Sequence, residues 1–376
     1  MNEKKPSVAE LIEYFESGCK NEKLLGLELE HFIVDKKTRR SLPYYGGVEL
    51  LLTRLQPLYG EAIISDMGNI IGVSNERANI TLEPAAQFEI SAAPSADLSE
   101  IKNIYDEFTN IVTPLLDEIN CEFACLGYHP KSIIDELPLI PKSRYNHMYS
   151  HFEKTGNCGK NMMKGSAAAQ VNIDYSSEAD FKKKFRVSCV MGPLIAFICD
   201  NTPIFEGKPY DGNMARTYIW NNVDPARSGI PPGALDRDYG FGDYAEYIYN
   251  MPDIYVPENE SEYMEHCLSM VFPDVRLKTR LELRMADSMP IDAAMDFMKL
   301  LSAMFYNEQR LNDFYKMTEH IKNSDVDEAK ASLMRDGQNA VVYGKTAAEW
   351  ITEIFKNGGS YEEFKRKVRI HYPQQI

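Results

Sequence analysis

The chain has 376 residues, of which 44% are hydrophobic, and its 41 basic and 56 acidic residues give a net charge of −15. This length allows one large domain or two smaller ones, each with a substantial core. An acidic chain without a basic run lacks the clustered Lys and Arg that phosphate backbones require, which argues against nucleic-acid binding.

No segment predicts a membrane span, because the most apolar run, residues 187–199, is short and interrupted. The first six residues lack the apolar stretch of a signal peptide. Seven cysteines, an odd number without close pairing, are typical of a reducing compartment. We therefore expect a cytoplasmic protein that makes no membrane contact.

Hydrophobic periodicity in the first third of the chain predicts alternating helices and strands. The pattern favours helices over residues 8–19, 48–58 and 98–119 and strands over residues 24–34, 80–91 and 122–128. Pro84 lies inside the second of these strands. Because proline cannot donate a ladder hydrogen bond, we expect it at an edge, bend or bulge.

The middle of the chain continues with a helix, a strand and a longer helix over residues 144–153, 167–175 and 178–199. Ser177 before Glu178 is a favourable start for the longer helix, and Pro193 is expected to kink it. Residues 202–242 are rich in Pro, Gly, Asn and Asp. Loops of this length in a domain usually bind or cover something.

The last third predicts a strand over residues 280–285 and about four helices from Pro290 onward. No repeat, low-complexity segment or obvious linker interrupts the chain. We therefore expect a single domain over residues 1–376, with a core over residues 1–305 and a C-terminal helical cover over residues 306–376.

Glutamates recur at even spacing in strand-like segments. Glu28 and Glu30 point to one face of their strand while Leu27 and Leu29 point to the other, because side chains alternate along a strand. Other polar side chains that share a face, if their strands stay regular, are Glu83 with Glu89, Gln170 with Asn172 and Asp174, and Glu282 with Arg284.

One such strand is most simply explained as half-exposed, with ordinary alternation. Several strands together favour another interpretation, because burying clustered carboxylates is prohibitive unless cations lie among them. Glutamate oxygens are hard ligands suited to Mg²⁺ or Mn²⁺. The pattern predicts an antiparallel sheet whose inner face is a multi-metal site, of the kind that serves phosphoryl transfer.

Other motifs give weaker signals. No GxxxxGK[ST] loop is present, so a nucleotide would be held by metals and arginines. Residues 240–245 match GxGxxA, but no strand or βαβ unit surrounds them. His147 and His151 are more simply a solvated or packed pair than metal ligands. Cys121 and Cys125 have no partner pair and are interpreted as core residues.

Arg216 and Trp220 lie four residues apart in the loop-rich segment. Their spacing fits a packed arginine–aromatic pair. It equally fits an arginine that clamps a substrate carboxylate through two hydrogen bonds. The residues alone leave both interpretations open.

Six motifs in collinear order resemble the glutamate–cysteine ligases, above all the plant and proteobacterial type, with the actinobacterial ergothioneine-pathway ligase nearby. The similarity covers most of residues 20–305. The motifs are GLELE at residues 26–30, LEPAAQFEIS at 82–91, QVNID at 170–174, PIFEGKP at 203–209, RTYIW at 216–220 and LELRMAD at 281–287.

The resemblance implies an α+β fold related to glutamine synthetase and the guanidino kinases, in which a curved antiparallel sheet forms a funnel with helices outside. It implies ATP-dependent formation of γ-glutamylcysteine. ATP would phosphorylate the γ-carboxylate of glutamate, and the amine of cysteine would attack the acyl phosphate. Such an enzyme uses ATP with two or three Mg²⁺ or Mn²⁺ ions, and its product feeds thiol pathways such as glutathione biosynthesis.

The resemblance also assigns residue roles. The metal-binding positions map onto Glu28, Glu30, Glu83, Glu89 and Glu282, with Gln170 on the strand that completes the site. The substrate-binding candidates are Arg216, Trp220, Asn172 and Arg186. Arg284 matches a phosphate-facing arginine that would bind ATP and act in catalysis together with Glu28 and Glu30.

Two departures from the family bear on these expectations. Residues 257–271 form a shorter segment than plant-type enzymes carry, and Ala85 and Ala86 stand where the family usually has two glycines. The shortened segment lies near where the amine substrate would be covered, so it affects which amine the site accepts. The alternatives are therefore a γ-glutamyl ligase with another amine acceptor, a non-catalytic ATP- or glutamate-binding relative and, with less support, a guanidino kinase. The oligomeric state is left open.

Overall fold

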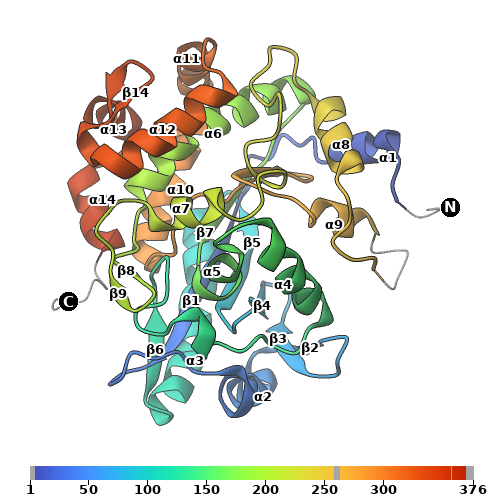
Figure 1. The fold of residues 1–376 in the computed structure, drawn as a ribbon, viewed down its shortest axis with the longest axis vertical. Helices are drawn as coiled ribbons and strands as arrows, with labels where there is room; N and C mark the ends of the chain where they lie inside the picture. The colour runs from blue at the N-terminus through green and yellow to red at the C-terminus, as the bar shows by residue number, and fades with distance from the viewer. Residues whose placement is uncertain (1–4, 258–262, 357, 370–376) are drawn as a thin grey trace.

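The computed structural model describes residues 5–257, 263–356 and 358–369. Its centre is a nine-stranded antiparallel sheet of order β12-β13-β7-β1-β5-β4-β3-β2, with β6 paired to the end of β1 (Figure 1). The strands are β1 (Leu25–Asp35), β2 (Glu61–Ile64), β3 (Ile70–Ser74), β4 (Ala78–Leu82), β5 (Phe88–Ser95), β6 (Cys121–Ala124), β7 (Ala169–Ile173), β12 (Val275–Leu277) and β13 (Leu281–Leu283).

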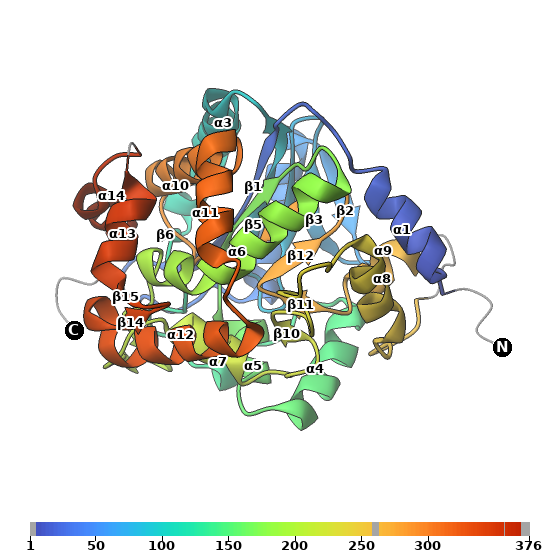
Figure 2. The ribbon, with the colours of Figure 1, turned by 90° about the horizontal axis from the view of Figure 1, so that it is seen from above.

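Helices cover both faces of this sheet. Figure 2 shows α3 and α10 on one side of it and α4, α5 and α7 on the other. The helices are α1 (Val8–Glu16), α2 (Glu49–Tyr59), α3 (Leu98–Glu118), α4 (Ser143–Thr155), α5 (Gly159–Gly165), α6 (Glu178–Ile198), α7 (Ala215–Asn221), α8 (Phe241–Asn250), α9 (Tyr263–Leu268), α10 (Ile291–Phe305), α11 (Glu308–Thr318), α12 (Asn323–Asp336), α13 (Ala347–Phe355) and α14 (Tyr361–Val368).

Short elements lie in the connections. They are β8 (Ile204–Phe205), β9 (Lys208–Pro209), β10 (Ser228–Gly229), β11 (Phe272–Pro273), β14 (Val341–Val342), β15 (Lys345–Thr346) and single helical turns at Tyr44–Val48, Ile134–Glu136 and Gly337–Asn339. The long loop predicted over residues 202–242 thus contains α7 and two small hairpin or bridge elements. The predicted α+β class with an antiparallel sheet is confirmed.

Strand β1 shows the predicted alternation. Leu25, Leu27 and Leu29 are buried in the main hydrophobic core, while Glu28 and Glu30 face the opposite side of the sheet. The strand pairs with β5, β7 and β6, so it lies at the middle of the sheet. Its acidic face is therefore flanked by strands on both edges.

The single strand predicted over residues 80–91 is wrong, because this stretch folds as the β4–β5 hairpin. The Glu83 carbonyl accepts from the amide of Ala86, and the Glu83 amide donates to the carbonyl of Gln87. Pro84 presets the first bend, as expected, and Ala86 adopts a left-handed φ of 66°. That conformation explains why glycine is favoured there, since a Cβ atom is strained at positive φ.

Helix α6 begins as predicted. The side chain of Ser177 accepts from the amide of Asp180, and the helix continues through Pro193 to Ile198. Within the described residues, five helices, α10–α14, follow β13 where about four were expected. Helices α11, α12 and α13 pack against α6. The division into a core and a C-terminal cover within one domain stays a prediction.

Arg186 donates to backbone carbonyls away from the acidic cavity. It lies on α6 with 7% of its surface exposed, outside the acidic cavity. Its guanidinium donates to the carbonyls of Leu235, Thr318, Glu319 and Ile321, which include the C-terminal end of α11. These donors are already used, so the substrate-binding role expected for Arg186 is not supported.

We predict that Arg186→Met destabilises the protein by roughly 2–5 kcal/mol, because the buried carbonyls at the end of α11 lose their donor. Urea unfolding of the variant measures the loss. Arg335→Met on α12 is the matched control, since that exposed arginine contacts only side chains of its own helix. A stable Arg186→Met protein with weakened substrate binding would contradict this structural role.

Candidate active site

A cavity of about 310 Å³ lies on the inner face of the sheet, under α4, α5, α7 and α9. The strands and the β4–β5 turn direct the predicted carboxylates into it, and α7 and β13 bring the predicted cations. The lining includes Glu28, Glu30, Glu83, Glu89, Gln170, Arg216, Trp220 and Arg284. Residues from distant parts of the chain thus line one cavity.

The sheet register sets the acidic wall. Glu30 on β1 lies directly opposite Glu89 on β5, and Glu28 lies opposite Gln170 on β7. Glu30 accepts from the amide of Ala168 at 2.7 Å and from Gln170 Nε2 at 3.0 Å. Glu89 accepts from the hydroxyl of Thr81 at 3.0 Å. The carboxylates are held by hydrogen bonds, and none of these donors carries a charge.

Burial and neighbouring carboxylates raise the pKa values of three of these acids. Burial and then the charge of Glu83 raise the pKa of Glu30 to about 7, against partial relief from Arg216. Burial and then Glu28, Glu83 and Glu30 raise the pKa of Glu89 well above its ordinary range. Burial also raises the pKa of Glu83, although nearby cations oppose it. The wall therefore carries negative charge that the protein leaves incompletely compensated.

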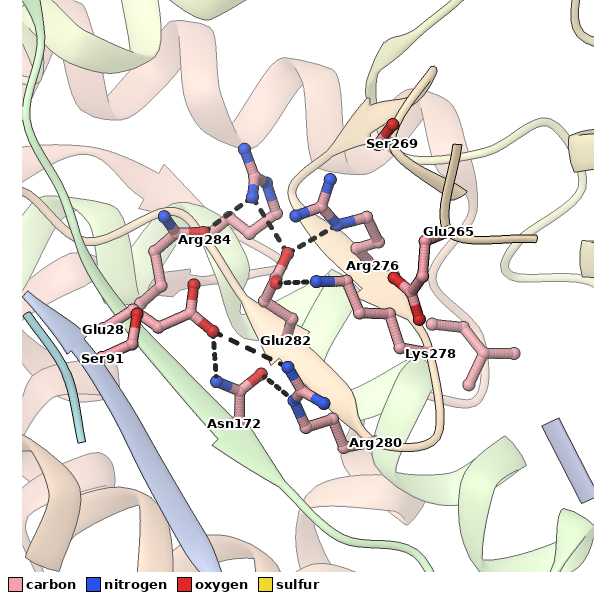
Figure 3. Close-up of polar contacts among 12 residues, drawn as sticks. Glu28, Ser91, Asn172, Glu265, Ser269, Arg276, Lys278, Arg280, Glu282 and Arg284 are labelled. Carbon is pink, nitrogen blue, oxygen red and sulfur yellow. Dashed lines mark hydrogen bonds and ion pairs between the residues drawn. The ribbon is translucent and has the colours of Figure 1, made fainter. Parts of the chain in front are cut away.

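Glu282 has the opposite surroundings. Its fully buried carboxylate contacts Arg276 Nε at 2.6 Å, Arg284 Nη1 at 2.9 Å and Lys278 Nζ at 3.0 Å (Figure 3). Burial would raise the pKa of this acid, but the three cations hold it well below its ordinary range. In this arrangement Glu282 anchors cations, and its oxygens face them rather than the open cavity.

A hydrogen-bonded chain joins the acidic wall to this cation cluster. Gln170 donates to Glu30 and accepts from Arg284 Nη1 at 2.7 Å. Arg284 in turn donates to Glu282. Gln170 thus fixes both a carboxylate and an arginine, which is a positioning role for its amide at the centre of the site.

Arg216 and Trp220 form the contact that their spacing predicted. The guanidinium of Arg216 lies 5.9 Å from the ring centroid of Trp220, and that of Arg284 lies at the same distance. Arg216 is 4% exposed, donates to the backbone carbonyl of Arg284 at 3.0 Å, and leaves its buried Nε without a partner. A buried guanidinium donor without a partner beside a cavity is suited to a carboxylate ligand.

Asn172 lies beside a second cavity of about 310 Å³ that shares Glu28 with the first. Its Nδ2 donates to Glu28 at 2.9 Å, and its Oδ1 accepts from Arg280 at 3.0 Å (Figure 3). Asn172 therefore supports Glu28 between the two cavities, and its side chain is not part of the lining around Arg216.

Several lining residues were missed from the sequence. The signal for Arg276 and Lys278, and for Arg280 beside the second cavity, is the alternation of charge in the β12–β13 hairpin, where these cations precede Glu282 and Arg284 at even spacing. The others, Lys142, Arg144 and Glu265, lie on α4 or its N-terminal boundary and on α9. Nothing in their local pattern separates them from ordinary surface charges.

The acidic wall has the chemistry of a divalent-cation site. Its oxygens are hard ligands, and its unneutralised charge is what a bound cation would offset. As the side chains stand, no group of three acidic, His or Cys residues within the described ranges is arranged to hold a metal ion. The donor set fits Mg²⁺ or Mn²⁺, whereas ligation would require the carboxylates to draw together.

The remaining motifs have structural roles. His151 contacts Asp224 at 2.9 Å, and His147 stacks on Tyr255. Gly240 precedes α8, and the residues before it form no strand, so the dinucleotide interpretation finds no support. Cys121 and Cys125 are buried and free, as expected. Within the part of the chain that the structure describes, no helix is long and apolar enough to cross a membrane.

Comparison with known proteins agrees with this site. The profile of glutamate-cysteine ligase family 2 matches residues 24–369. Chloroplastic glutamate–cysteine ligase A of Oryza sativa subsp. japonica is 29% identical, covering 93% of this chain and 77% of that protein. The chloroplastic enzyme of Arabidopsis thaliana is 31% identical, covering 75% of this chain and 59% of that protein.

Among solved structures, glutamate–cysteine ligase of Francisella tularensis in complex with AMP superposes with a TM-score of 0.55 at 12% identity, covering 94% of this chain and 82% of that one. At that identity the likeness shows the fold. Taken with the family profile, it defines a ligase built on an antiparallel sheet. The chain belongs to glutamate-cysteine ligase family 2, which confirms the resemblance of its six motifs.

We predict that Glu89→Gln stabilises the metal-free protein at pH 8 and much less at pH 5. Native Glu89 has a raised pKa, so its contribution to stability is fully present below about 4.5, its ordinary value, and is lost as pH rises through the native value. Glutamine keeps an acceptor for Thr81 and loses the charge. Urea unfolding in a chelator at both pH values measures the difference.

The same unfolding measurement is repeated with added Mg²⁺. Added Mg²⁺ should raise the stability of the native protein at pH 8 more than that of Glu89→Gln, because the charge that attracts the ion is smaller in the variant. Glu61→Gln, on the exposed face of β2, is the control. An equal stability difference at both pH values, with no Mg²⁺ effect, would count against the charge-rich wall.

Proposed function

We propose that the protein is an ATP-dependent glutamate–cysteine ligase, which forms γ-glutamylcysteine through a γ-glutamyl phosphate. The observation that carries this proposal is one cavity in which an acidic wall faces separate groups of cations. Membership of glutamate-cysteine ligase family 2 supports the same chemistry. The AMP-bound relative from Francisella tularensis supports the use of an adenine nucleotide.

The acidic wall would hold two or three Mg²⁺ or Mn²⁺ ions through Glu28, Glu30, Glu83, Glu89 and Gln170. Bound ions supply neutralisation of the phosphate charge, which lets a weakly nucleophilic carboxylate approach ATP. Glu282 would join the ligands only by releasing one of its three cations. In the structure, Glu282 forms ion pairs with Arg276, Lys278 and Arg284, which line the cavity.

The chain's own residues would orient the reactants. Arg216 would bind a carboxylate of glutamate beside the ring of Trp220. The γ-carboxylate oxygen then attacks the γ-phosphorus of ATP and ADP leaves, while Arg284 stabilises the charge on the transferred phosphoryl group. The amine of the acceptor attacks the acyl carbon, the C–O bond to phosphate breaks, and the amine proton is lost to solvent. The second cavity, which meets the first at Glu28, has room for the rest of the nucleotide.

Substrate reacts with substrate in this scheme, so the protein needs no nucleophile of its own, and positioning supplies most of the rate. The fold does not specify the amine acceptor, because specificity lies in the site. The shortened segment includes residues 258–262, which lie outside the described residues. A γ-glutamyl ligase with another amine acceptor is therefore the second candidate.

We also propose a cytoplasmic location. All seven cysteines are free thiols and six of them are buried, which suits a reducing compartment. The plant relatives are chloroplastic proteins by name, so the compartment differs among members of the family.

The first test is ADP release by purified protein with ATP, Mg²⁺ and glutamate, with and without cysteine. We expect cysteine-dependent ADP and a product with the mass of γ-glutamylcysteine. Glutamate-dependent turnover that ignores cysteine would move the assignment to another amine. Binding of Mg-ATP by calorimetry without turnover on any amine would favour the non-catalytic alternative.

We predict that Glu28→Gln lowers turnover by orders of magnitude and leaves the fold intact. Glutamine keeps an acceptor for Asn172 Nδ2 and removes one of the charges on the acidic wall. Steady-state ADP release and circular dichroism measure the two effects, with Glu61→Gln as the matched control. Full activity, or an unfolded variant, would refute the metal-ligand role of Glu28.

A further inference from the structure

A buried lysine of the C-terminal helices forms an ion pair close to the arginines of the site. Lys330 on α12 is 3% exposed, and its Nζ lies 2.6 Å from Oδ2 of Asp274. Helix α12 packs against α6 and α7 (Figure 2), so this lysine reaches the β12–β13 hairpin from the side of those helices. Among the described residues, no other cation lies within ion-pair distance of Asp274.

Asp274 is the cross-strand neighbour of Arg284. The amide of Arg284 donates to the carbonyl of Asp274 at 2.9 Å, which continues the β12–β13 register by one residue pair. The two side chains therefore leave the hairpin on the same face, where opposite charges attract. Instead, Asp274 pairs with Lys330, and the guanidinium of Arg284 donates to Glu282 and Gln170.

A small cavity of about 20 Å³ joins this ion pair to the substrate-facing side chains. Its lining includes Asp274, Lys330, Arg216, Trp220 and Arg284. Arg216, Trp220 and Arg284 also line the main cavity. The same two guanidinium groups are therefore close both to the Lys330–Asp274 pair and to the space for the reactants.

The charge of Asp274 acts on Arg216 as well. Burial lowers the pKa of Arg216, and the negative charges of Asp287, Glu30 and Asp274 raise it in turn. Arg216 keeps one buried donor, Nε, without a partner. A carboxylate left without its own cation would compete for such donors, because a guanidinium binds carboxylates in preference to neutral acceptors.

We propose that Lys330 is a positioning residue that keeps Asp274 from binding Arg216 and Arg284, so that both guanidinium groups stay available to anionic reactants. This inference rests on the proposed function, in which Arg216 binds glutamate and Arg284 faces the transferred phosphoryl group. Lys330 itself touches no reactant in this scheme. Its place on α12 makes the C-terminal helices part of the machinery that prepares the sheet for its substrates.

The test compares single variants of the ion pair with the double variant. Lys330→Met leaves Asp274 unpaired beside the arginines, so the KM for glutamate should rise about 10-fold with a smaller change in kcat. Asp274→Asn removes the competing charge, keeps the backbone carbonyl that accepts from Arg284, and should retain the native KM. Lys330→Met/Asp274→Asn should return the KM to within about 2-fold of the native value. Lys316→Met, on the exposed side of α11, is the control.

An ion pair that only docks α12 gives a different pattern. Both single variants would then lose stability and kcat together, without a selective change in the KM for glutamate. Equal KM values in Lys330→Met and Asp274→Asn, or a double variant as impaired as Lys330→Met, would overturn the proposal. If Lys330→Met unfolds, Lys330→Gln replaces it, because glutamine keeps a donor for Asp274 without the charge. Unfolding of both variants would assign the pair to folding alone and overturn the positioning role.

Calorimetric titration with glutamate in the presence of Mg²⁺ separates this inference from the proposed function. Native protein that binds glutamate but forms no γ-glutamylcysteine from ATP and cysteine refutes the proposed function. The Kd for glutamate still tests Lys330 in that case, through weaker binding by Lys330→Met and recovery in the double variant. Native turnover with an unchanged Kd and KM in Lys330→Met keeps the function and overturns the role of Lys330. Native protein that neither binds glutamate nor turns over overturns both.

Discussion

The site depends on repulsion among buried carboxylates that the sheet forces together. Glu28 and Glu30 must share a face of β1, and the antiparallel register puts Glu89 directly against Glu30. The raised pKa values of Glu30 and Glu89 record the electrostatic cost of that placement. Repulsion within this acidic wall destabilises the protein when no cation is bound. Binding of a cation in the cavity is therefore favoured.

Glu282 has the same chemistry and the opposite role. It lies on β13 next to β7, where Arg276 from the paired strand, Lys278 from the turn and Arg284 just after β13 all reach it. The same residue type is thus under-neutralised on β1 and β5 and over-neutralised on β13. The contrast creates a negative wall and a positive wall within one cavity, joined by the amide of Gln170. A triphosphate with its cations would complement both.

The helices close the site and separate its cations. Helix α7 brings Arg216 and Trp220 from the long loop, and α4 brings Arg144 from a segment far from either acidic strand. Arg186 joins α6 to the end of α11 through backbone carbonyls. Some arginines of this chain therefore line the cavity, whereas Arg186 donates to backbone carbonyls elsewhere. The partners of their N–H groups, and not the residue type, distinguish the two kinds.

The sequence by itself determined the local structure and much of the acidic site. Alternation in β1, the cap at Ser177 and the apolar periods of the helices are local properties, so they were predictable within a few residues. The strand predicted over residues 80–91 failed because Pro84 and Ala86 turn the chain, and a short period-2 pattern does not reveal a reversal inside it. The resemblance to the family predicted that Glu28, Glu30 and Arg216 share one site. It did not show which strands, helices and contacts bring them together.

Only the tertiary structure decided which charges meet. The chain does not show that Glu282 would be surrounded by three cations, that Arg186 would donate to backbone carbonyls, or that Arg144 would line the cavity. Such properties depend on distances between residues far apart in sequence, and on burial, which sets how strongly charges interact. Residue type and local spacing fix what a side chain is able to do, and packing fixes which partner it meets.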